Sequence, residues 1–350
     1  MERTSYRIID ANFNRAREAI RVTEDFCRFS LNSESLALRA KELRHLLCTA
    51  VGRLDCGKLI SSRDTADDVG IGKTVVSQLH RTGVRDCFLA ACKRLTEALR
   101  VLAEMIQPID TEIANKIEQL RYAAYTLERD VTLFSDTSER FKGVGLYIII
   151  TDERPMDIIS LTKKCIAGGA DCIQLRVKTM DDDKFLAAAE GFVQVCRSGN
   201  VLSIINDRVD IAVAAGADGV HLGQNDLPAA VARKLQMTPL IIGKTTHSLQ
   251  QLASACAEMP TYVSLGPVFA TATKPDIKAV GIEYVEKAAE ILTCIRGVAI
   301  GGINADNIEK VLAAGAAAVA VSSAVTNAAD PAYACRAIKE IMNTAKKPLF

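Results

Sequence analysis

The sequence predicts an α/β protein in which a (β/α)8 TIM barrel follows an all-α helical domain. Residues 145–350 alternate eight short β-rich runs with alanine-rich segments of helical spacing, and a barrel of this kind requires eight such units in about 200 to 250 residues. Residues 1–135 place apolar side chains at three-to-four spacing and show almost no strand-like alternation. A doubly wound sheet is the alternative for the second half, but it usually has fewer strands.

The helical half begins with an apolar stripe at helical spacing, formed by Phe13, Ala16, Ile20, Thr23 and Cys27. Asp10 or Asn12 is expected to cap this helix. Similar patterns predict helices over 33–51, 84–106 and 111–133. The polar stretch 136–144 is predicted to be a linker between the two domains, 1–135 and 145–350.

The second half contains the eight predicted strands, which are Leu146–Thr151, Cys172–Arg176, Leu202–Asn206, Gly219–Leu222, Leu240–Gly243, Tyr262–Gly266, Val298–Ile300 and Ala318–Val321. Gly-Ala-Asp or a close variant precedes three of them, beginning at Gly169, Gly216 and Gly315. Because a glycine commonly ends a helix in the left-handed conformation, each of these three glycines is predicted to be a C-cap.

The composition excludes several classes of protein. A net charge of +1 gives no bulk attraction to nucleic acid or to an anionic membrane. The eleven cysteines are an odd number without Cys-x-x-Cys spacing, which indicates reduced thiols rather than a disulfide frame or a zinc site. No secretory signal and no apolar run of membrane-spanning length is visible. We therefore expect a cytoplasmic protein.

Polar side chains follow the predicted strands at their carboxyl ends, where a barrel gathers its ligands. Asp207 follows the third strand and Asp226 follows the fourth, so both carboxylates are expected on one rim. Strand alternation places Gln174, Arg176 and Lys178 on one side of the second strand. Carboxylates and cations on one rim indicate a divalent metal that holds a phosphorylated substrate.

The later strand ends carry hydroxyls and glycines, which are the usual barrel device for binding a phosphate. Thr245 follows the fifth strand, and the seventh and eighth lead to Gly301-Gly302 and Ser322-Ser323.

Taken singly, an aspartate after a strand is more often a helix cap, and cations are usually surface residues. Their gathering on six or more strand ends favours a site. His221 and His247 are interpreted as structural or orienting residues rather than nucleophiles.

Six ordered motifs resemble the thiamine-phosphate synthase family: QLRVK, INDRVDIA, GADGVHLGQND, GPVFATATKPD, VAIGGIN and AVSSAV. The resemblance covers residues 145–346. It implies a (β/α)8 barrel that joins 4-amino-2-methyl-5-(diphosphooxymethyl)pyrimidine to 4-methyl-5-(2-phosphoethyl)thiazole, with Mg²⁺, and releases thiamine phosphate and pyrophosphate. The partners expected are therefore small-molecule substrates, with no nucleic acid and no membrane; a homo-oligomer is compatible with the sequence.

The resemblance also implies a role for each site residue. Mg²⁺ would be held by Asp207 and Asp226. The pyrimidine pyrophosphate would be bound by Gln174, Arg176, Lys178, Asn206, Thr245 and Lys274, with Gln174 on the pyrimidine. The thiazole phosphate would be bound by Thr271, Thr273, Gly302, Ser322 and Ser323. Two residues depart from the family pattern, because Lys244 replaces an apolar residue and Ser322 replaces a common Val or Ile.

The helical half resembles, through RIIDANFNRAREAIRVTEDFCRF and the RD of SSRDTADD, a domain sometimes fused ahead of this synthase. That domain is linked to hydroxymethylpyrimidine phosphate kinase activity, with ATP as the candidate donor. Arginines on one helix face, together with Arg63-Asp64, are candidate phosphate ligands; they are Arg17, Arg21 and Arg28. The alternatives are a solvated helix face and a non-catalytic oligomerisation or docking module.

Two other functions compete for the barrel. A thiazole tautomerase-like paralogue would not need the metal and pyrophosphate residues, so the presence of Arg176, Lys178, Asp207, Asp226 and Lys274 argues against it. A non-catalytic barrel that binds thiamine intermediates would be distinguished from an enzyme by Mg²⁺-dependent release of pyrophosphate.

Overall fold

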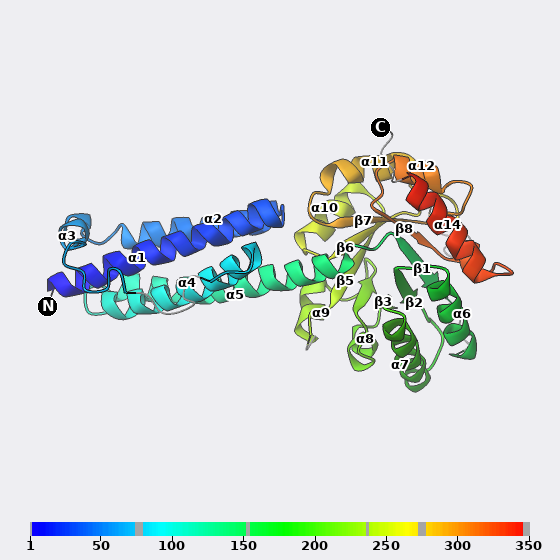
Figure 1. Cartoon of the computed structure of the whole chain (residues 1–350), viewed down its shortest axis with the longest axis horizontal. Coiled ribbons are helices and arrows are strands. Elements are labelled where there is room, and N and C mark those ends of the chain that lie inside the picture. Colours follow the sequence, from blue (N-terminus) through cyan, green and yellow to red (C-terminus); the bar gives the residue numbers. More distant parts are fainter. Residues whose placement is uncertain (1, 74–79, 152–154, 236–237, 272–277, 346–350) are drawn as a thin grey trace. The chain divides into compact units, whose positions relative to one another are not determined.

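The computed structural model describes residues 2–73, 80–151, 155–235, 238–271 and 278–345. The chain divides into two compact units, Met1–Leu133 and Phe134–Phe350. The first is helical (Figure 1), with α1 (Glu2–Asp25), a π-helical turn η1 (Phe26–Ser30), α2 (Glu34–Val51), α3 (Cys56–Ser61), α4 (Val84–Ile106) and the first part of α5 (Thr111–Phe141).

Helix α1 is the centre of the helical unit and packs against both α2 and α4. The apolar stripe predicted from Ala16 to Cys27 is buried. The predicted cap is wrong, because α1 begins at Glu2 and Asp10 and Asn12 lie inside it. Buried Tyr6 and Ile9 continue the stripe toward the N-terminus. Their packing stabilises the first turns of α1, which precede Asp10 and Asn12.

The predicted linker 136–144 is helical as far as Phe141, since α5 continues through the boundary between the two units. No glycine or proline interrupts the chain between Thr111 and Gly143, so the backbone meets no helix breaker. Phe134 and Phe141 are buried within this stretch. The polarity of the surrounding residues therefore marks the exposed face of a helix.

The second unit is a closed barrel of eight parallel strands, β1 to β8 in order. The strands are β1 (Leu146–Ile150), β2 (Cys172–Leu175), β3 (Leu202–Asn206), β4 (Gly219–Leu222), β5 (Ile241–Thr246), β6 (Tyr262–Leu265), β7 (Arg296–Ile300) and β8 (Ala318–Val321). Pairing of β1 with β8 closes the barrel, with Leu146 opposite Val319. The predicted (β/α)8 fold is confirmed.

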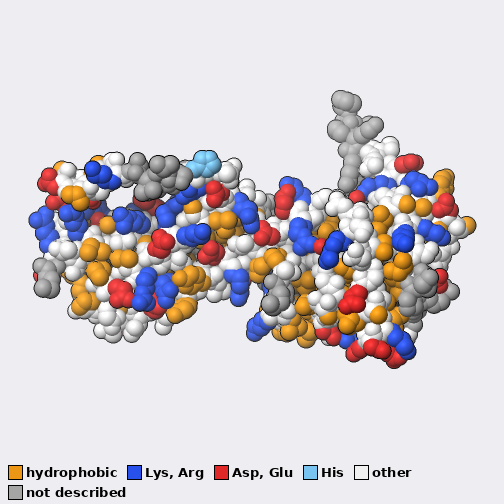
Figure 2. Space-filling view, turned by 60° about the horizontal axis from the view of Figure 1, so that its bottom comes forward, with side chains coloured by type: hydrophobic (Ala, Val, Ile, Leu, Met, Phe, Trp, Pro, Cys, Tyr) orange, Lys and Arg blue, Asp and Glu red, His pale blue; other side chains and the backbone are white. Residues whose placement is uncertain are grey.

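Helices cover the outside of the barrel (Figure 1). They are α6 (Pro155–Ala167), α7 (Asp182–Ser198), α8 (Val209–Ala214), α9 (Ala229–Leu235), α10 (Leu249–Ala257), α11 (Ile282–Ile291), α12 (Ile308–Ala313), α13 (Ser323–Thr326) and α14 (Pro331–Ala345). Among the described residues no helix is long and apolar enough to cross a membrane. Figure 2 shows basic and acidic side chains interspersed on the drawn face, in keeping with the net charge of +1.

The three predicted glycine C-caps have the left-handed backbone that glycine favours, with φ of 89° at Gly169, 66° at Gly216 and 90° at Gly315. The aspartates that follow the first two tie neighbouring strands together. Asp171 Oδ2 accepts from the backbone N–H of Leu146 at 2.8 Å, and Asp218 Oδ2 accepts from that of Ser203 at 2.9 Å. These short turns therefore help to fix the register of the strands.

The N-terminal end of the barrel is filled by aromatic side chains. Phe141, at the end of α5, stacks on Tyr262 with ring centroids 4.4 Å apart, and Tyr147 meets both rings edge-on. All three side chains are buried. Tyr147 and Tyr262 also line a cavity at the carboxyl ends of the strands, so this aromatic cluster lies at the floor of that cavity.

All eleven cysteines are free thiols, as the sequence predicted. Six of them are buried, and burial raises the pKa of Cys27 and that of Cys165 to about 12. Because the thiolate is the reactive form of cysteine, these two side chains pack as small apolar groups.

Candidate active site at the carboxyl rim of the barrel

A cavity of about 620 Å³ opens at the carboxyl ends of the strands. Every predicted site residue that the structure describes lines it: Gln174, Arg176, Lys178, Asn206, Asp207, Asp226, Thr245, Thr271, Gly302, Ser322 and Ser323. Thr273 and Lys274 lie outside the described residues. The barrel thus brings together side chains from β2 to β5 and from the loops that follow β6 to β8.

The most strongly charged part of the cavity is a pair of carboxylates beside a lysine. Lys178 forms an ion pair with Asp207, and Asp207 is hydrogen-bonded to Asp226. Burial and the contact with Asp207 raise the pKa of Asp226. Burial acts in the same direction on Asp207, but Lys178 and Asp226 outweigh it and lower the pKa of Asp207. The two carboxylates are therefore close enough to share one proton.

This pair has the chemistry that a hard divalent cation requires, since such ions prefer carboxylate and carbonyl oxygens. Asp226 is held in place because its Oδ2 accepts from the backbone N–H of Gly223 at 2.6 Å. No cluster of three or more His, Cys, Asp or Glu suited to a metal occurs among the described residues. A cation here would take its other ligands from water and from substrate phosphate, as Mg²⁺ typically does.

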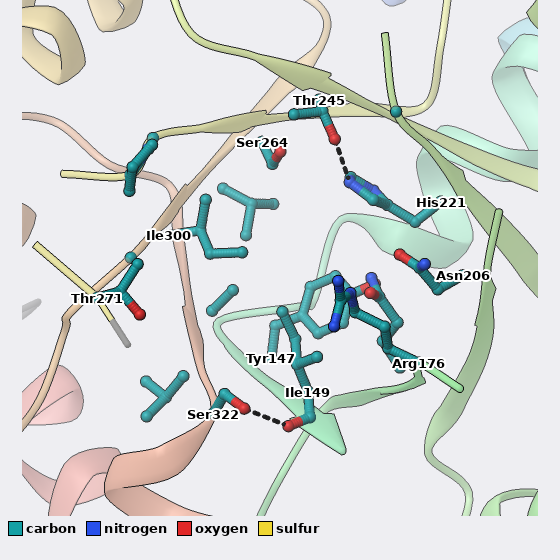
Figure 3. Close-up of a pocket in the computed structure, with 18 of the residues that line it drawn as sticks. Tyr147, Ile149, Arg176, Asn206, His221, Thr245, Ser264, Thr271, Ile300 and Ser322 are labelled. Atoms are coloured by element: carbon teal, nitrogen blue, oxygen red, sulfur yellow. Dashed lines mark hydrogen bonds between the residues drawn. The ribbon is translucent and has the colours of Figure 1, made fainter. Parts of the chain in front are cut away.

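Arg176 and Asn206 line the same cavity and point into it (Figure 3). The backbone N–H of Arg176 donates to the carbonyl of Ile150 at 2.8 Å, which holds the start of the β2–α7 loop against β1. Asn206 ends β3 and is only 6% exposed. A guanidinium, an ammonium and an amide thus share one cavity with the two carboxylates, and this combination suits a polyanion bound through a metal.

The opposite side of the cavity is formed by the loops after β7 and β8. Gly302 has φ of +64°, and a Cβ there would lie 2.6 Å from the carbonyl oxygen of Ala270. Asn307 Nδ2 donates to the carbonyl of Gly302 at 2.9 Å and braces the loop. The Ser322 hydroxyl donates to the carbonyl of Ile149 at 2.8 Å (Figure 3), so its proton is already engaged with the backbone.

Lys244, which departs from the family pattern, does not line the cavity. Alternation along β5 turns Thr245 inward and Lys244 outward. Lys244 is buried and forms an ion pair with Glu258 at 3.4 Å, outside the strand layer. The substitution therefore changes the packing between β5 and its covering helices, and the rim residues keep their arrangement.

Sequence reasoning missed a buried polar layer at the floor of the cavity. Gln174 Nε2 donates to the hydroxyl of Tyr147 at 2.8 Å, and the hydroxyls of Tyr147 and Tyr262 are 2.8 Å apart. His221 lies between Tyr262 and Thr245, at 3.0 and 2.9 Å. The orienting role predicted for His221 agrees with these contacts. An inward-facing tyrosine in a strand has the same local pattern as any core residue, so no local signal indicated this layer.

In the helical unit, the predicted phosphate-binding arginines do not converge. Arg63 makes a bidentate pair with Asp10, at 2.7 and 2.8 Å, and Arg21 pairs with Glu24 at 3.2 Å. Arg28 lies over the ring of Phe29. At a rise of about 1.5 Å per residue, the backbone of Arg28 is roughly 27 Å from that of Asp10 along the helix axis. One phosphate cannot contact Arg28 and Arg63 together.

Comparison with known proteins agrees with this geometry. The family model described as thiamine monophosphate synthase matches residues 146–325. The chain belongs to the thiamine monophosphate synthase family. A second model, that of the ThiD2 family, matches residues 7–130 of the helical unit. The family is one of transferases in thiamine biosynthesis, and this member carries an additional N-terminal domain.

Relatives in this family extend over nearly the whole chain. The thiamine-phosphate synthase of Prochlorococcus marinus (strain MIT 9313) is 39% identical over 331 residues, covering 93% of this chain and 92% of the relative. That of Nostoc punctiforme is 36% identical over 349 residues, covering 100% of this chain and 97% of the relative. The solved thiamine phosphate pyrophosphorylase from Pyrococcus furiosus covers 59% of this chain and 99% of its own, at 35% identity and a TM-score of 0.55.

Proposed function

We propose that the barrel condenses 4-amino-2-methyl-5-(diphosphooxymethyl)pyrimidine with 4-methyl-5-(2-phosphoethyl)thiazole to form thiamine phosphate and pyrophosphate. The observation that carries this proposal is the pairing of Asp207 and Asp226 beside Lys178, in one cavity with Arg176 and the Gly302 and Ser322 loops. Membership of the thiamine monophosphate synthase family supports it. The free thiols suit the reducing cytoplasm, where we place the reaction.

The reaction needs a leaving group stabilised more than it needs a strong base. Asp207 and Asp226 would hold Mg²⁺, which would neutralise charge on the departing pyrophosphate. Arg176 and Lys178 would contact the pyrophosphate oxygens where charge develops. The aminopyrimidine can carry the positive charge left at its methylene carbon. The cavity would then hold the thiazole nitrogen against that carbon, and closeness and orientation would supply much of the rate.

A thiazole tautomerase-like activity is less well supported. An isomerisation of the thiazole releases no pyrophosphate and so needs neither the carboxylate pair nor the two cations. Lys178 and Asp207 are in contact within the cavity, which is the arrangement expected for pyrophosphate and metal binding.

For the helical unit we propose phosphorylation of the pyrimidine monophosphate, with ATP as donor. The match to the ThiD2 family supports this proposal, and the product would be the substrate of the barrel. The paired Arg63 and Asp10, with Arg7 donating to the carbonyl of Asp64 at 2.7 Å, make the α1–α3 end a charged region suited to phosphate. The alternative is a module without catalysis.

One assay tests both proposals. The full chain, given the thiazole phosphate and the pyrimidine monophosphate with Mg²⁺, is expected to form thiamine phosphate only when ATP is present. The pyrimidine pyrophosphate should give product without ATP. Product from the pyrophosphate alone would keep the synthase and remove the kinase. A folded sample that forms no product from either substrate would contradict the main proposal.

Gly302→Ala should raise the KM for the thiazole phosphate about tenfold and change the KM for the pyrimidine pyrophosphate much less. The added Cβ would meet the Ala270 carbonyl at 2.6 Å and would strain a backbone with φ of +64°, so the loop must shift. Steady-state kinetics with each substrate varied in turn would measure this.

Gly281→Ala is the matched control for Gly302→Ala. It has φ of +82°, but a Cβ there meets nothing within 4 Å, and Gly281 does not line the cavity. It should lower stability through backbone strain and leave both KM values unchanged. Equal effects of the two substitutions on KM would contradict the assignment of Gly302 to the thiazole site.

A further inference from the structure

Five polar side chains form a continuous hydrogen-bonded chain across the floor of the cavity: Gln174, Tyr147, Tyr262, His221 and Thr245. They come from β2, β1, β6, β4 and β5. Each link is between 2.8 and 3.0 Å, and Figure 3 shows the last one, from His221 to Thr245. All five line the cavity, and Gln174 and Thr245 are the two ends of the chain.

The number of protons in this chain fixes its direction. Gln174 Nε2 donates to Tyr147, and a tyrosine has one hydroxyl proton to donate onward. The Cys172 thiol also hydrogen-bonds Tyr147, but sulfur is a weak acceptor, so the Tyr147 proton goes to Tyr262. Tyr262 must then donate to His221 Nδ1.

Burial supports this count because it keeps both phenols protonated. Burial raises the pKa of Tyr147 and that of Tyr262 well above the ordinary value of tyrosine. The packing is also built around the link between Tyr262 and His221. A Cβ on Gly243 would collide with the Tyr262 hydroxyl and with His221 Nδ1, so a residue without a side chain is required at that point of β5.

We propose that this chain is a directional network that holds His221 with its ring proton on Nε2, and thereby fixes the polarity of both ends that face the cavity. His221 then donates from Nε2 to Thr245, and the Thr245 hydroxyl donates into the cavity. At the other end the amide nitrogen of Gln174 faces Tyr147, and its Oε1 is presented as an acceptor. Tyr147, Tyr262 and His221 are positioning residues in this arrangement.

The consequence for specificity rests on the proposed function. An acceptor at Gln174 selects a substrate that carries a hydrogen-bond donor, such as the exocyclic amine of an aminopyrimidine. A substrate with a carbonyl at that position would place two acceptor oxygens together with no proton between them. Polar groups left unpaired in a closed site cost binding free energy, so this substrate would bind more weakly. The donor at Thr245 selects an acceptor, such as a pyrophosphate oxygen.

The ring proton can be observed without substrate, by ¹⁵N NMR of the ligand-free full chain labelled at its four histidines. His221→Gln assigns the His221 signals by their loss. We expect a neutral ring protonated at Nε2. In Gln174→Glu, measured at a pH where the glutamate is ionised, the carboxylate only accepts, so every link should reverse and the proton should move to Nδ1. A wild-type ring protonated at Nδ1, or at both nitrogens, would overturn the proposal, as would an unchanged tautomer in Gln174→Glu.

Tyr284→Phe is the matched control because it also removes a buried hydroxyl, one that donates to Thr246 Oγ1 at 2.6 Å away from the network. It should leave the His221 signals unchanged, whereas Tyr262→Phe should alter them and lower kcat/KM for the pyrimidine pyrophosphate about tenfold. A Tyr262→Phe chain with unaltered His221 signals would contradict the network. Since the NMR result needs no turnover, it stands or fails independently of the synthase activity.

Discussion

Asp207→Ala is expected to lower kcat/KM for thiamine phosphate formation about 10³-fold, because a metal that neutralises a leaving group contributes several kcal/mol to transition-state stabilisation. Asp207 is the carboxylate whose pKa is lowered by Lys178 and Asp226 despite burial, so it is the member of the pair that remains charged. Without it, Asp226 alone would hold the cation. Initial rates at several Mg²⁺ concentrations, with the thiazole phosphate saturating and the pyrimidine pyrophosphate varied from below its KM, measure the loss.

Asp181→Ala provides the matched control for this substitution. Asp181 also precedes a helix and pairs with a lysine, Lys184, at 2.7 Å, but its side chain is 71% exposed and does not line the cavity. It should retain the wild-type rate. The assignment of Asp207 would be wrong if Asp207→Ala, folded as judged by circular dichroism, kept more than about a tenth of the wild-type kcat/KM.

The strands could be found from the sequence because parallel strands in a barrel are buried on both faces and read as short apolar runs. Errors occurred where polar residues lie within a strand. β5 continues through Thr245 and Thr246, and β7 begins at Arg296. Thr246 Oγ1 donates to the Ser264 carbonyl and Arg296 Nη2 to the Val144 carbonyl. These polar groups are satisfied by tertiary contacts that no local pattern contains.

The rim residues could be predicted because topology alone places the ends of parallel strands together. The tyrosines could not, since an inward-facing tyrosine in a strand has the same local pattern as any core residue. Tyr147 and Tyr262 are 115 positions apart in the sequence. Their contact depends on barrel closure and on the space left by Gly243, so it becomes visible only in three dimensions.

The end of α5 gives the largest expected change in stability. Phe141→Ala should destabilise the barrel by about 3–5 kcal/mol, because the ring is 0% exposed and stacks on Tyr262 at 4.4 Å. Phe29→Ala, whose ring is 71% exposed, should change stability by less than about 0.5 kcal/mol. Urea unfolding of both full-length variants, followed through the barrel transition, gives the comparison. Equal effects of the two substitutions would mean that Phe141 contributes no more to the stability of the barrel than an exposed ring does. A large loss confined to Phe141→Ala is the result expected from its packing on Tyr262.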